Sequence, residues 1–470
     1  MKSKKLFVAA ALAAAAGLVS LLDASDARAC GGCFGEQPSV VTDHRMVLAV
    51  SQGQTTLYDQ LQYTGDPKSF AWVLPIVGQV DVSVSSAVMF GTLDGATQTR
   101  VVPPPRNCPP YPSNCPSQRG ADAGAPSAAG GADGVDVLKS EVVGPYETVQ
   151  LRSTDPNALN TWLADHAFTI PEDTKPIIGQ YVTEHFDFLA VKLVPGKGVQ
   201  SMVPIAVTTV GASPVLPLRM VAAGAGASVG ITLWVVSEGR YEPQNFPFFH
   251  IEDSELVWDW NANLSNYRTL RAEKTAASGG KAWEIESSTT LSKQTVERTI
   301  SYQETYDRQT GEASPGGYAP VTDAQGKVIK TSQQVLAEDM ERLFGKLPGQ
   351  SFRATRMRAD LSKQALGQDL LVKASADQAA LSAIRQVTRE ANEPQCPVYD
   401  NCKQVGTAPR SEAAAGSTSL SGGGCRTNGK DANPGGTTLL ALGGVATILA
   451  ARARLRKNRA SVDMRNDTRK

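Results

Sequence analysis

The sequence predicts an α+β protein that is rich in β-structure, with a largely antiparallel sheet and a few short helices. Short runs of β-branched and aromatic residues recur along the chain, as in 186–194 (FDFLAVKLV), 203–209 (VPIAVTT) and 231–236 (ITLWVV). Two short helical patterns interrupt this series, and the strands follow one another too closely for repeated parallel crossovers. At 470 residues the chain is long enough to bury a sizeable core in one large or two ordinary domains.

A hairpin over residues 55–77 is predicted to form the centre of the core. Residues 55–63 partly alternate between apolar and polar, as a half-buried strand does, and residues 64–67 (TGDP) are typical of a turn. Residues 70–74 (FAWVL) are apolar on both faces, which indicates a strand covered on both sides. We therefore expect the two strands to pair, and we expect Trp72 to pack in the core rather than to serve as a ligand platform.

The other elements are expected in the following order. Asp155 precedes a proline and Thr174 precedes an apolar helical face, so each marks the start of a helix. A third helix is expected over 335–344, with Gly345 at its end. The stretch 261–332 is polar, with only scattered alternation. Further strands are expected at 45–51, 80–88, 141–153, 186–194, 203–209, 216–222, 231–236, 355–361 and 370–374.

The first 29 residues have the order of a secretory signal. Lysines precede an apolar run over 6–22, and a small residue stands at Ala27 and at Ala29, so we expect cleavage between Ala29 and Cys30. A cysteine at this position also suggests a lipoprotein signal, but Arg28 and Ala27 fit that pattern poorly. We therefore expect export with ordinary cleavage.

The last 75 residues are predicted to anchor the chain. A disulfide loop and a flexible tether rich in Gly, Ser and Ala are expected over 396–436, followed by a transmembrane span over 437–453 and a basic cytoplasmic tail over 454–470. A helix over 437–453 would be about 26 Å long, slightly short of a hydrocarbon core of about 30 Å. The alternative is an amphipathic helix packed on the body, which the lack of charge over 439–451 disfavours.

The body between these ends is acidic. Removing the four basic and two acidic residues of 1–29, and the eight basic and two acidic residues of 452–470, leaves 34 basic against 42 acidic residues. Such a body without a basic stripe argues against nucleic acid as a partner. Within it, residues 103–134 are rich in Pro, Gly and Ala and are expected to form a surface insert.

Seven cysteines fall as three close pairs and a singleton: Cys30 and Cys33, Cys108 and Cys115, Cys396 and Cys402, and Cys425. In an oxidising compartment the six paired cysteines are expected to form structural disulfides, for which 15 pairings exist. Pairing within each local pair is the simplest. A cross-pairing between the similar loops 108–115 and 396–402 is the alternative, and it would join the insert to the C-terminal end of the body.

The CGGC sequence over 30–33 allows a redox dithiol or a metal site. Redox activity requires a βαβ context and a helix N-terminus that lowers the pKa of the first thiol. The residues that follow, 34–39, read as a loop. A structural disulfide or another structural pairing is therefore expected here.

Several residues have the types, but not the full pattern, of a chemical site. Gly226-Ala227-Ser228-Val229-Gly230 matches G-x-S-x-G, but a nucleophile elbow needs a helix after the serine, and a strand is expected there. His185 lies beside acidic residues and could act as an acid or base. His250 precedes an acidic run ending at Asp259, which could bind a hard cation but reads more readily as a solvated face. The aromatic residues around 246–260 could form a binding surface, although core packing is favoured.

Two resemblances follow from the motifs. The start CGGC, YTGDPKSFAWVLPIV, WLADHAFTIPEDTKPIIGQYVTEHFDFLAVKL, VLPLRMVA and ITLWVVSEGRYEP resemble the DUF2330 family of exported bacterial proteins over about residues 30–375, without the insert. The resemblance implies class and compartment, but that family brings no activity and no catalytic residue. The glycines before Cys425, the short span and the arginine cluster resemble the MYXO-CTERM sorting tail. That resemblance implies a sorting protease that cuts near Cys425 and a lipid on that cysteine.

We therefore expect an envelope-anchored protein displayed at the cell surface, with a body over 30–395 that binds or scaffolds rather than catalyses. No catalytic residue, metal or cofactor is assigned, and the ligand is unknown. The membrane is the expected partner, through the span or the lipid. The alternative is an exported hydrolase that uses His185 or Ser228 in an unrecognised active site.

Overall fold

The computed structural model describes residues 33–34, 40–64, 71–111, 131–132, 140–166, 168, 172, 174–194, 201–222, 228–306, 313–323, 325–400 and 402–416. These residues belong to one compact unit that ends at Ala414, apart from the last two residues of the final helix. The fold is α+β and rich in strands, and its sheets are mostly antiparallel, as the sequence predicts.

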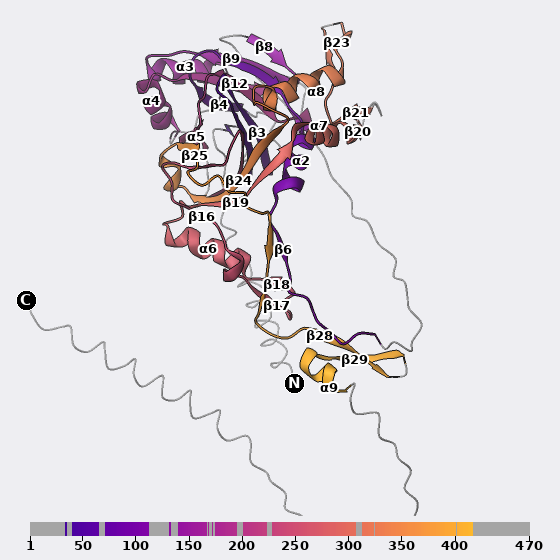
Figure 1. The fold of residues 1–470 in the computed structure, drawn as a ribbon. Coiled ribbons are helices and arrows are strands. Elements are labelled where there is room, and N and C mark those ends of the chain that lie inside the picture. Colours follow the sequence, from indigo (N-terminus) through magenta and orange to yellow (C-terminus); the bar gives the residue numbers. More distant parts are fainter. Residues whose placement is uncertain are drawn as a thin grey trace, which may run out of the picture. The chain divides into compact units, whose positions relative to one another are not determined.

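Two sheets form the body (Figure 1). The larger sheet has eight strands in the order β16 (Phe248–Phe249), β19 (Trp283–Ser292), β24 (Ser351–Ser362), β14 (Ser228–Ser237), β2 (Val40–Val50), β3 (Gln54–Thr64), β12 (Ile205–Val210) and β5 (Asp81–Val84). The smaller sheet has five strands in the order β1 (Cys33–Phe34), β4 (Ala71–Ile76), β10 (Asp187–Leu193), β9 (Tyr146–Leu151) and β8 (Ser140–Val143). Within these sheets, only the β14–β2 and β16–β19 pairs are parallel.

The predicted hairpin over 55–77 is wrong. Its first half is β3, which pairs with β2 and β12 in the larger sheet, and its second half is β4, which pairs with β1 and β10 in the smaller sheet. The local turn signal led to the wrong pairing because it contains no information about which sheet each strand joins. Both strands are nevertheless central, and Trp72 is 5% exposed in the core between the sheets.

The larger sheet is covered on both faces, which explains its nearly continuous apolar strands. In β2, Met46 and Leu48 face one core, and Val47 and Ala49 face the other. The helices α2 (Ala87–Thr97), α7 (Lys293–Ser301) and α8 (Ser332–Met340), the last continued by a π-helical turn over Glu341–Gly345, supply the apolar side chains that cover the second face. Figure 1 shows these helices together beside the sheet.

The smaller sheet is covered on its outer face by α3 (Pro156–Asp165) and α4 (Lys175–Thr183). Asp155 is the N-cap of α3 and accepts a hydrogen bond from the backbone N–H of Asn157, and Thr174 occupies the N-cap position of α4. Both helix starts are therefore as predicted. The hairpin β8–β9 turns at Gly144, whose φ of +61° suits glycine.

Two other predictions are corrected. The strand expected over 80–88 ends at Val84, and residues 87–97 form α2, which Ser86 caps with its side chain. The strand expected over 216–222 is a two-residue strand, β13 (Val215–Leu216), followed by the helix α5 (Leu218–Ala222). The polar stretch 261–332 contains α6 (Tyr267–Ala277), α7 and β19. In β19 the buried Glu284 accepts from Tyr267, and the buried Glu286 pairs with Arg356.

Short strands complete the unit. They are β6 (Arg100–Val102) with β26 (Ile384–Gln386), β28 (Gln395–Asp400) with β29 (Lys403–Pro409), β20 (Glu304–Tyr306) with β21 (Ala313–Pro315), β22 (Val321–Thr322) with β23 (Val328–Lys330), β7 (Gly131–Ala132) with β11 (Ser201–Met202), the sheet β13, β25 (Leu370–Ala374) and β15 (Tyr241–Pro243), and the sheet β18 (Leu264–Ser265), β17 (Val257–Asp259) and β27 (Arg389–Glu390). Two 3-10 turns, Asp253–Glu255 and Ala365–Gly367, and the helix α9 (Arg410–Gly416) are also present.

The membrane span expected over 437–453 lies outside the described residues. Among the helices that the structure describes, none combines the length and the apolarity needed to cross a bilayer.

Candidate functional site

Ser228 and His185, the two residues of the hydrolase alternative, lie on different elements. Ser228 is the first residue of β14, pairs with Ser362 and is exposed, so a strand follows it rather than the helix of a nucleophile elbow. His185 is exposed after α4 with a φ of +63°, a left-handed conformation that ends the helix. No hydrogen bond between described residues joins Ser228 to a histidine.

The acidic run after His250 is used for local structure. His250 Nε2 lies 2.5 Å from Glu252 Oε1, but Glu255 accepts from the Glu252 backbone and pairs with Lys274 at 2.7 Å. A hydrogen bond from Asn392, together with those from the backbone N–H groups of Ala262 and Asn261, lowers the pKa of the Asp259 carboxyl. Within the described ranges, no three His, Cys, Asp or Glu side chains gather as a metal-binding group.

The aromatic residues around 246–260 pack mainly in a core, as favoured from the sequence. Phe246 is 4% exposed and Trp258 is 8% exposed, and Trp258 contacts Trp260 edge-on with ring centroids 5.9 Å apart. Arg106 lies over the Trp260 ring, 4.9 Å from its centroid. These contacts tie the segment that leads into the insert to the aromatic cluster.

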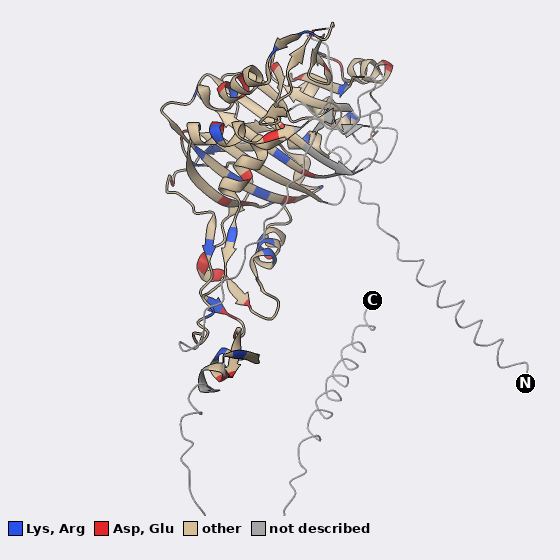
Figure 2. Ribbon diagram, turned by 90° about the vertical axis from the view of Figure 1, so that its right-hand side faces the viewer, with Lys and Arg blue, Asp and Glu red and all other residues tan. Residues whose placement is uncertain are grey.

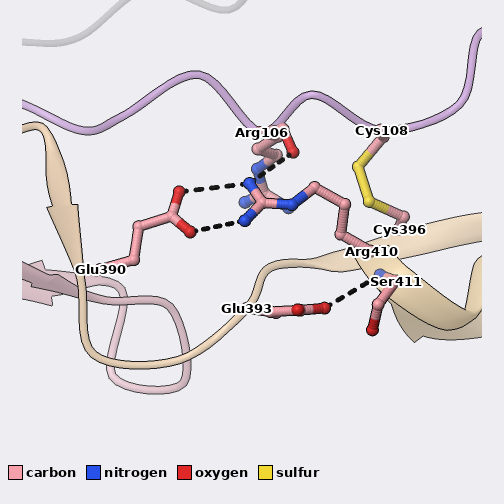
Figure 3. The surroundings of a disulfide bond; sticks show 7 residues. All are labelled: Arg106, Cys108, Glu390, Glu393, Cys396, Arg410 and Ser411. Atoms are coloured by element: carbon pink, nitrogen blue, oxygen red, sulfur yellow. Dashed lines mark hydrogen bonds and ion pairs between the residues drawn. A yellow bond between two sulfur atoms is a disulfide. The ribbon is translucent and has the colours of Figure 1, made fainter.

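A long-range disulfide joins the two cysteine-containing loops. Cys108 is bonded to Cys396, 288 positions further along the chain, so the simple local pairing of Cys396 with Cys402 is wrong and the alternative cross-pairing is present (Figure 3). Cys402 is also disulfide-bonded. Sequence spacing favoured the local loop because it contains no information about β6 and β26, whose parallel pairing brings residues 100–102 beside 384–386.

The described residues do not include four other positions of the predicted sites: Ala29, Cys30, Cys115 and Cys425. For Cys33 only the backbone is described, as the partner of Trp72 in β1 and β4.

Charged contacts reinforce the disulfide (Figure 3). Arg410 donates two hydrogen bonds to the Glu390 carboxylate, at 3.2 and 2.7 Å, and a third to the Arg106 carbonyl at 3.4 Å. The Glu393 carboxylate accepts from the backbone N–H of Ser411 at 2.9 Å. The hydrogen bonds from Arg410 and Ser411 hold the pKa values of Glu390 and Glu393, respectively, below their usual range.

We call residues 106–108, 390–396 and 410–411 the C-terminal clamp. They join the entry to the insert with the last described strands and with α9, directly before residue 417. Because one of the connections is covalent, the C-terminal segment cannot separate from residue 108 without reduction of a bond.

Charged residues elsewhere are mixed in sign. Figure 2 shows Lys and Arg interspersed with Asp and Glu along the described strands and helices. Arg219, for example, pairs with both Glu184 and Asp369 at 2.6 and 2.7 Å and covers the Tyr181 ring. Such charges are engaged locally.

A buried histidine–aspartate pair lies against an internal cavity between the two sheets. His44 on β2 and Asp59 on β3 are 0% and 3% exposed, and His44 Nδ1 is 3.4 Å from the nearest carboxylate oxygen of Asp59. The other ring nitrogen of His44, Nε2, is buried and has no hydrogen-bond partner among the described residues. Besides this pair, the cavity is lined by Met46, Leu57, Trp72, Leu74, Leu216, Pro217, Met220 and Val221.

The cavity is small and mostly apolar. Its volume of about 10 Å³, measured for the centre of a water-sized sphere, is close to the lower limit for a single water molecule or ion. Burial raises the pKa of the Asp59 carboxyl, and the neighbouring His44 opposes that effect. The sequence alone does not single out His44 and Asp59 as a pair. Alternation along β2 does place His44 and Met46 on one face.

Two further buried acids belong to hydrogen-bond networks. The Asp339 carboxylate on α8 accepts from Ser85 and Tyr318 at 2.5 and 2.6 Å, and burial raises its pKa to about 6. Glu284 on β19 accepts from Tyr267 at 2.6 Å, and burial raises its pKa to about 7. Neither acid lines the cavity.

The family described as an uncharacterized protein conserved in bacteria (DUF2330) matches residues 24–308, which is more than half of the chain. The chain belongs to the DUF2330 family. No curated protein matches this DUF2330 member.

Among solved structures, two chains match. One is the crystal structure of baculovirus P35, which has 8% sequence identity and a TM-score of 0.29, with 72% of this chain and 98% of that chain covered. At this TM-score, the likeness supports no statement about the fold or the function of the DUF2330 protein.

Proposed function

We propose that this DUF2330 protein is exported, anchored to the cell envelope by its C-terminus and displayed at the cell surface, where its body binds or scaffolds rather than catalyses. The observation that carries the proposal is the C-terminal clamp. It fixes the last described strands to the body by the Cys108–Cys396 disulfide, directly before the segment expected to form the tether.

A disulfide in this position suits an exported protein, because disulfides persist in oxidising compartments. It also suits an anchored one. Force applied to the C-terminal segment is transmitted through the disulfide to residue 108, so that the hydrogen bonds between β6 and β26 do not carry the whole force. The two hydrogen bonds between Arg410 and Glu390 add a charge-assisted contact at the same point.

The tail beyond the clamp supplies the anchor in this proposal. Glycines precede Cys425, an uncharged stretch follows over 439–451, and arginines cluster from Arg452 to Arg459, in the order of a MYXO-CTERM sorting tail. A sorting protease would cut near Cys425, and a lipid on that cysteine would hold the product at the surface. Without processing, the span over 437–453 would hold it in the membrane with the basic end in the cytoplasm.

A binding or scaffolding role is favoured over hydrolysis by the positions of the candidate catalytic residues. Ser228 starts a strand, His185 ends a helix, and no described hydrogen bond connects Ser228 to a histidine. The ligand of the body is not specified by these observations, and a pull-down from envelope extract with the mature body addresses it directly.

The anchoring is tested by fractionating cells that express the full chain, followed by protease treatment of intact cells. Wild type and the neighbouring control Ser421→Ala should stay with the envelope and be cleaved from outside. Cys425→Ala should lose surface retention, either by release into the medium or by accumulation inside. Unchanged surface retention of Cys425→Ala would contradict the lipid anchor, and protection of the wild type in intact cells would contradict surface display.

A further inference from the structure

The cavity beside His44 combines nitrogen and sulfur donors in an enclosed apolar space. His44, Met46 and Met220 all line it, and Met46 and Met220 are 4% and 2% exposed. His44 and Met46 are two residues apart on one face of β2, so their backbones are about 6.6 Å apart along the strand. Met220 reaches the same cavity from α5.

The His44 ring is held as a ligand ring usually is. Metal-ligating histidines typically use one ring nitrogen for the metal and direct the other to a carboxylate, which fixes the tautomer and the ring orientation. Here Nδ1 faces the Asp59 carboxylate at 3.4 to 3.5 Å, and Nε2 is buried without a partner among the described residues. An imidazole nitrogen left without a hydrogen bond in an apolar interior is unfavourable unless something occupies the space in front of it.

We propose that this cavity binds one soft monovalent cation, Cu(I), through His44 Nε2 and the thioether sulfurs of Met46 and Met220. Thioether and imidazole ligands suit Cu(I), whereas Mg²⁺ and Ca²⁺ require oxygen ligands. Zn²⁺ is bound by thiolates, imidazoles and carboxylates, and the cavity provides no thiolate, one imidazole and one carboxylate, that of Asp59, which faces Nδ1 of the same imidazole. Thioethers also suit an oxidising compartment, because they cannot be removed from a site by disulfide formation.

The remaining lining fits the same ligand. The volume of about 10 Å³ accepts one small ion and excludes a hydrated cation or an organic molecule. Trp72 lines the cavity at 5% exposure, and an indole face attracts a desolvated cation. The donors come from β2 and α5 and the indole comes from β4, so the site exists only when both sheets are packed together.

The test uses the full chain, blocked at free thiols with N-ethylmaleimide so that cysteines do not take up copper. Cu(I) is supplied anaerobically against bicinchoninic acid as a competing chelator, both to the folded protein and during refolding, so that a closed cavity does not prevent loading. The variants are Met46→Leu with Met220→Leu, which conserve side-chain volume, and the matched control is Met89→Leu with Met357→Leu, two fully buried methionines away from the cavity.

Wild type and the control should retain one equivalent of Cu(I), with sulfur and nitrogen ligands by X-ray absorption, and the Met46→Leu, Met220→Leu variant should bind at least tenfold more weakly. Excess Zn²⁺ should not displace the copper. Ag(I) should quench wild-type tryptophan fluorescence, and it should quench a Trp72→Phe variant less. Equal retention by the Met46→Leu, Met220→Leu variant and wild type would overturn the proposal. Displacement by Zn²⁺, or a wild type that holds no copper after refolding with it, would also overturn it, and in the last case the cavity would hold only water.

Discussion

Replacing Asp339 with asparagine should remove a pH dependence of stability that wild type shows between about pH 4 and pH 6. Asp339 is fully buried on α8, where its Oδ2 accepts from the Ser85 and Tyr318 hydroxyls and its Oδ1 has no partner among the described residues. Burial raises the pKa of this carboxyl from 3.8 to about 6, although these hydrogen bonds and the charge of Arg342 act in the opposite direction.

The size of the effect follows from linkage. Each pH unit between the two pKa values corresponds to about 1.36 kcal/mol, so the interval from 3.8 to about 6 corresponds to about 3 kcal/mol. The folded state keeps a proton that the unfolded state loses above pH 3.8. The contribution of Asp339 to the free energy of unfolding is therefore fully present below pH 3.8, falls as the pH rises through 6, and is constant above that.

The measurement is urea unfolding of wild type and Asp339→Asn at pH values from 4 to 8. Asparagine does not titrate, and its carbonyl can still accept from Ser85 and Tyr318. The free energy of unfolding of wild type minus that of Asp339→Asn should fall by about 2.4 kcal/mol between pH 4 and pH 7, because the rest of the effect lies outside this interval. Asp165→Asn, at an exposed position near the end of α3, should show no such change.

A difference between wild type and Asp339→Asn that stays constant from pH 4 to pH 8 would refute the reasoning. A difference that grows with pH would mean that the hydrogen bonds and Arg342 outweigh burial. In that case the folded-state pKa would lie below 3.8.

Three further predictions concern the core, the larger sheet and the clamp. Trp72→Ala should lower the free energy of unfolding by about 3–5 kcal/mol in urea titrations, because it empties the space between the sheets; an equally stable variant would show that the centre of the core is misplaced. The free energy of unfolding of wild type should fall by about 3 kcal/mol relative to that of Glu284→Gln between pH 4.5 and 7, since burial raises the Glu284 pKa from 4.5 to about 7. Parallel pH profiles of the two proteins would contradict this. Replacing Cys108 and Cys396 together with alanine should expose residues 396–416 to limited proteolysis, at a loss of up to about 5 kcal/mol on the chain-entropy model; unchanged protection would mean that the other contacts hold the segment alone.

The sequence predicted the fold class because apolar runs within the body that were predicted to be strands are strands in the structure. The run 231–236 lies in β14, in the middle of the larger sheet, and 186–194 contains β10. The helix start at Asp155 was predictable because its capping hydrogen bond is local, whereas Thr174 occupies the N-cap position of α4 without a side-chain capping bond. Strand pairing was not predictable from the sequence, since β3 and β4 are neighbours in sequence but belong to different sheets.

The strand β19 was missed because its polar groups are buried by partners on other elements. β19 reads as polar, yet Glu284 is fully buried because Tyr267 donates to it, and Glu286 is buried because Arg356 pairs with it. A β-bulge between Ile285 and Ser287 adjusts the register at this point. These partners are identified only when the chain is folded.

The candidate site was missed because its residues come from elements that are distant in sequence. His44 and Met46 share a face of β2, which alternation predicts, but Met220 comes from a segment predicted to be a strand and found to be the helix α5. The disulfide was half predicted, because both cysteines were expected to form disulfides but the simplest pairing was the wrong one.

Two neighbouring residues of β3 connect the pH-sensitive network with the cavity. Tyr58 points to one face of the larger sheet and donates to the Asp339 carbonyl at 3.3 Å, and Asp59 points to the other face and contacts His44. Because successive side chains of a strand alternate between faces, the two networks share a backbone but no side chain. Asp339→Asn should therefore change the pH profile of stability without changing the ligands of the cavity. If that variant also lost copper, the two faces of the sheet would be coupled through the backbone of β3, and His44 could not be treated as an independent site.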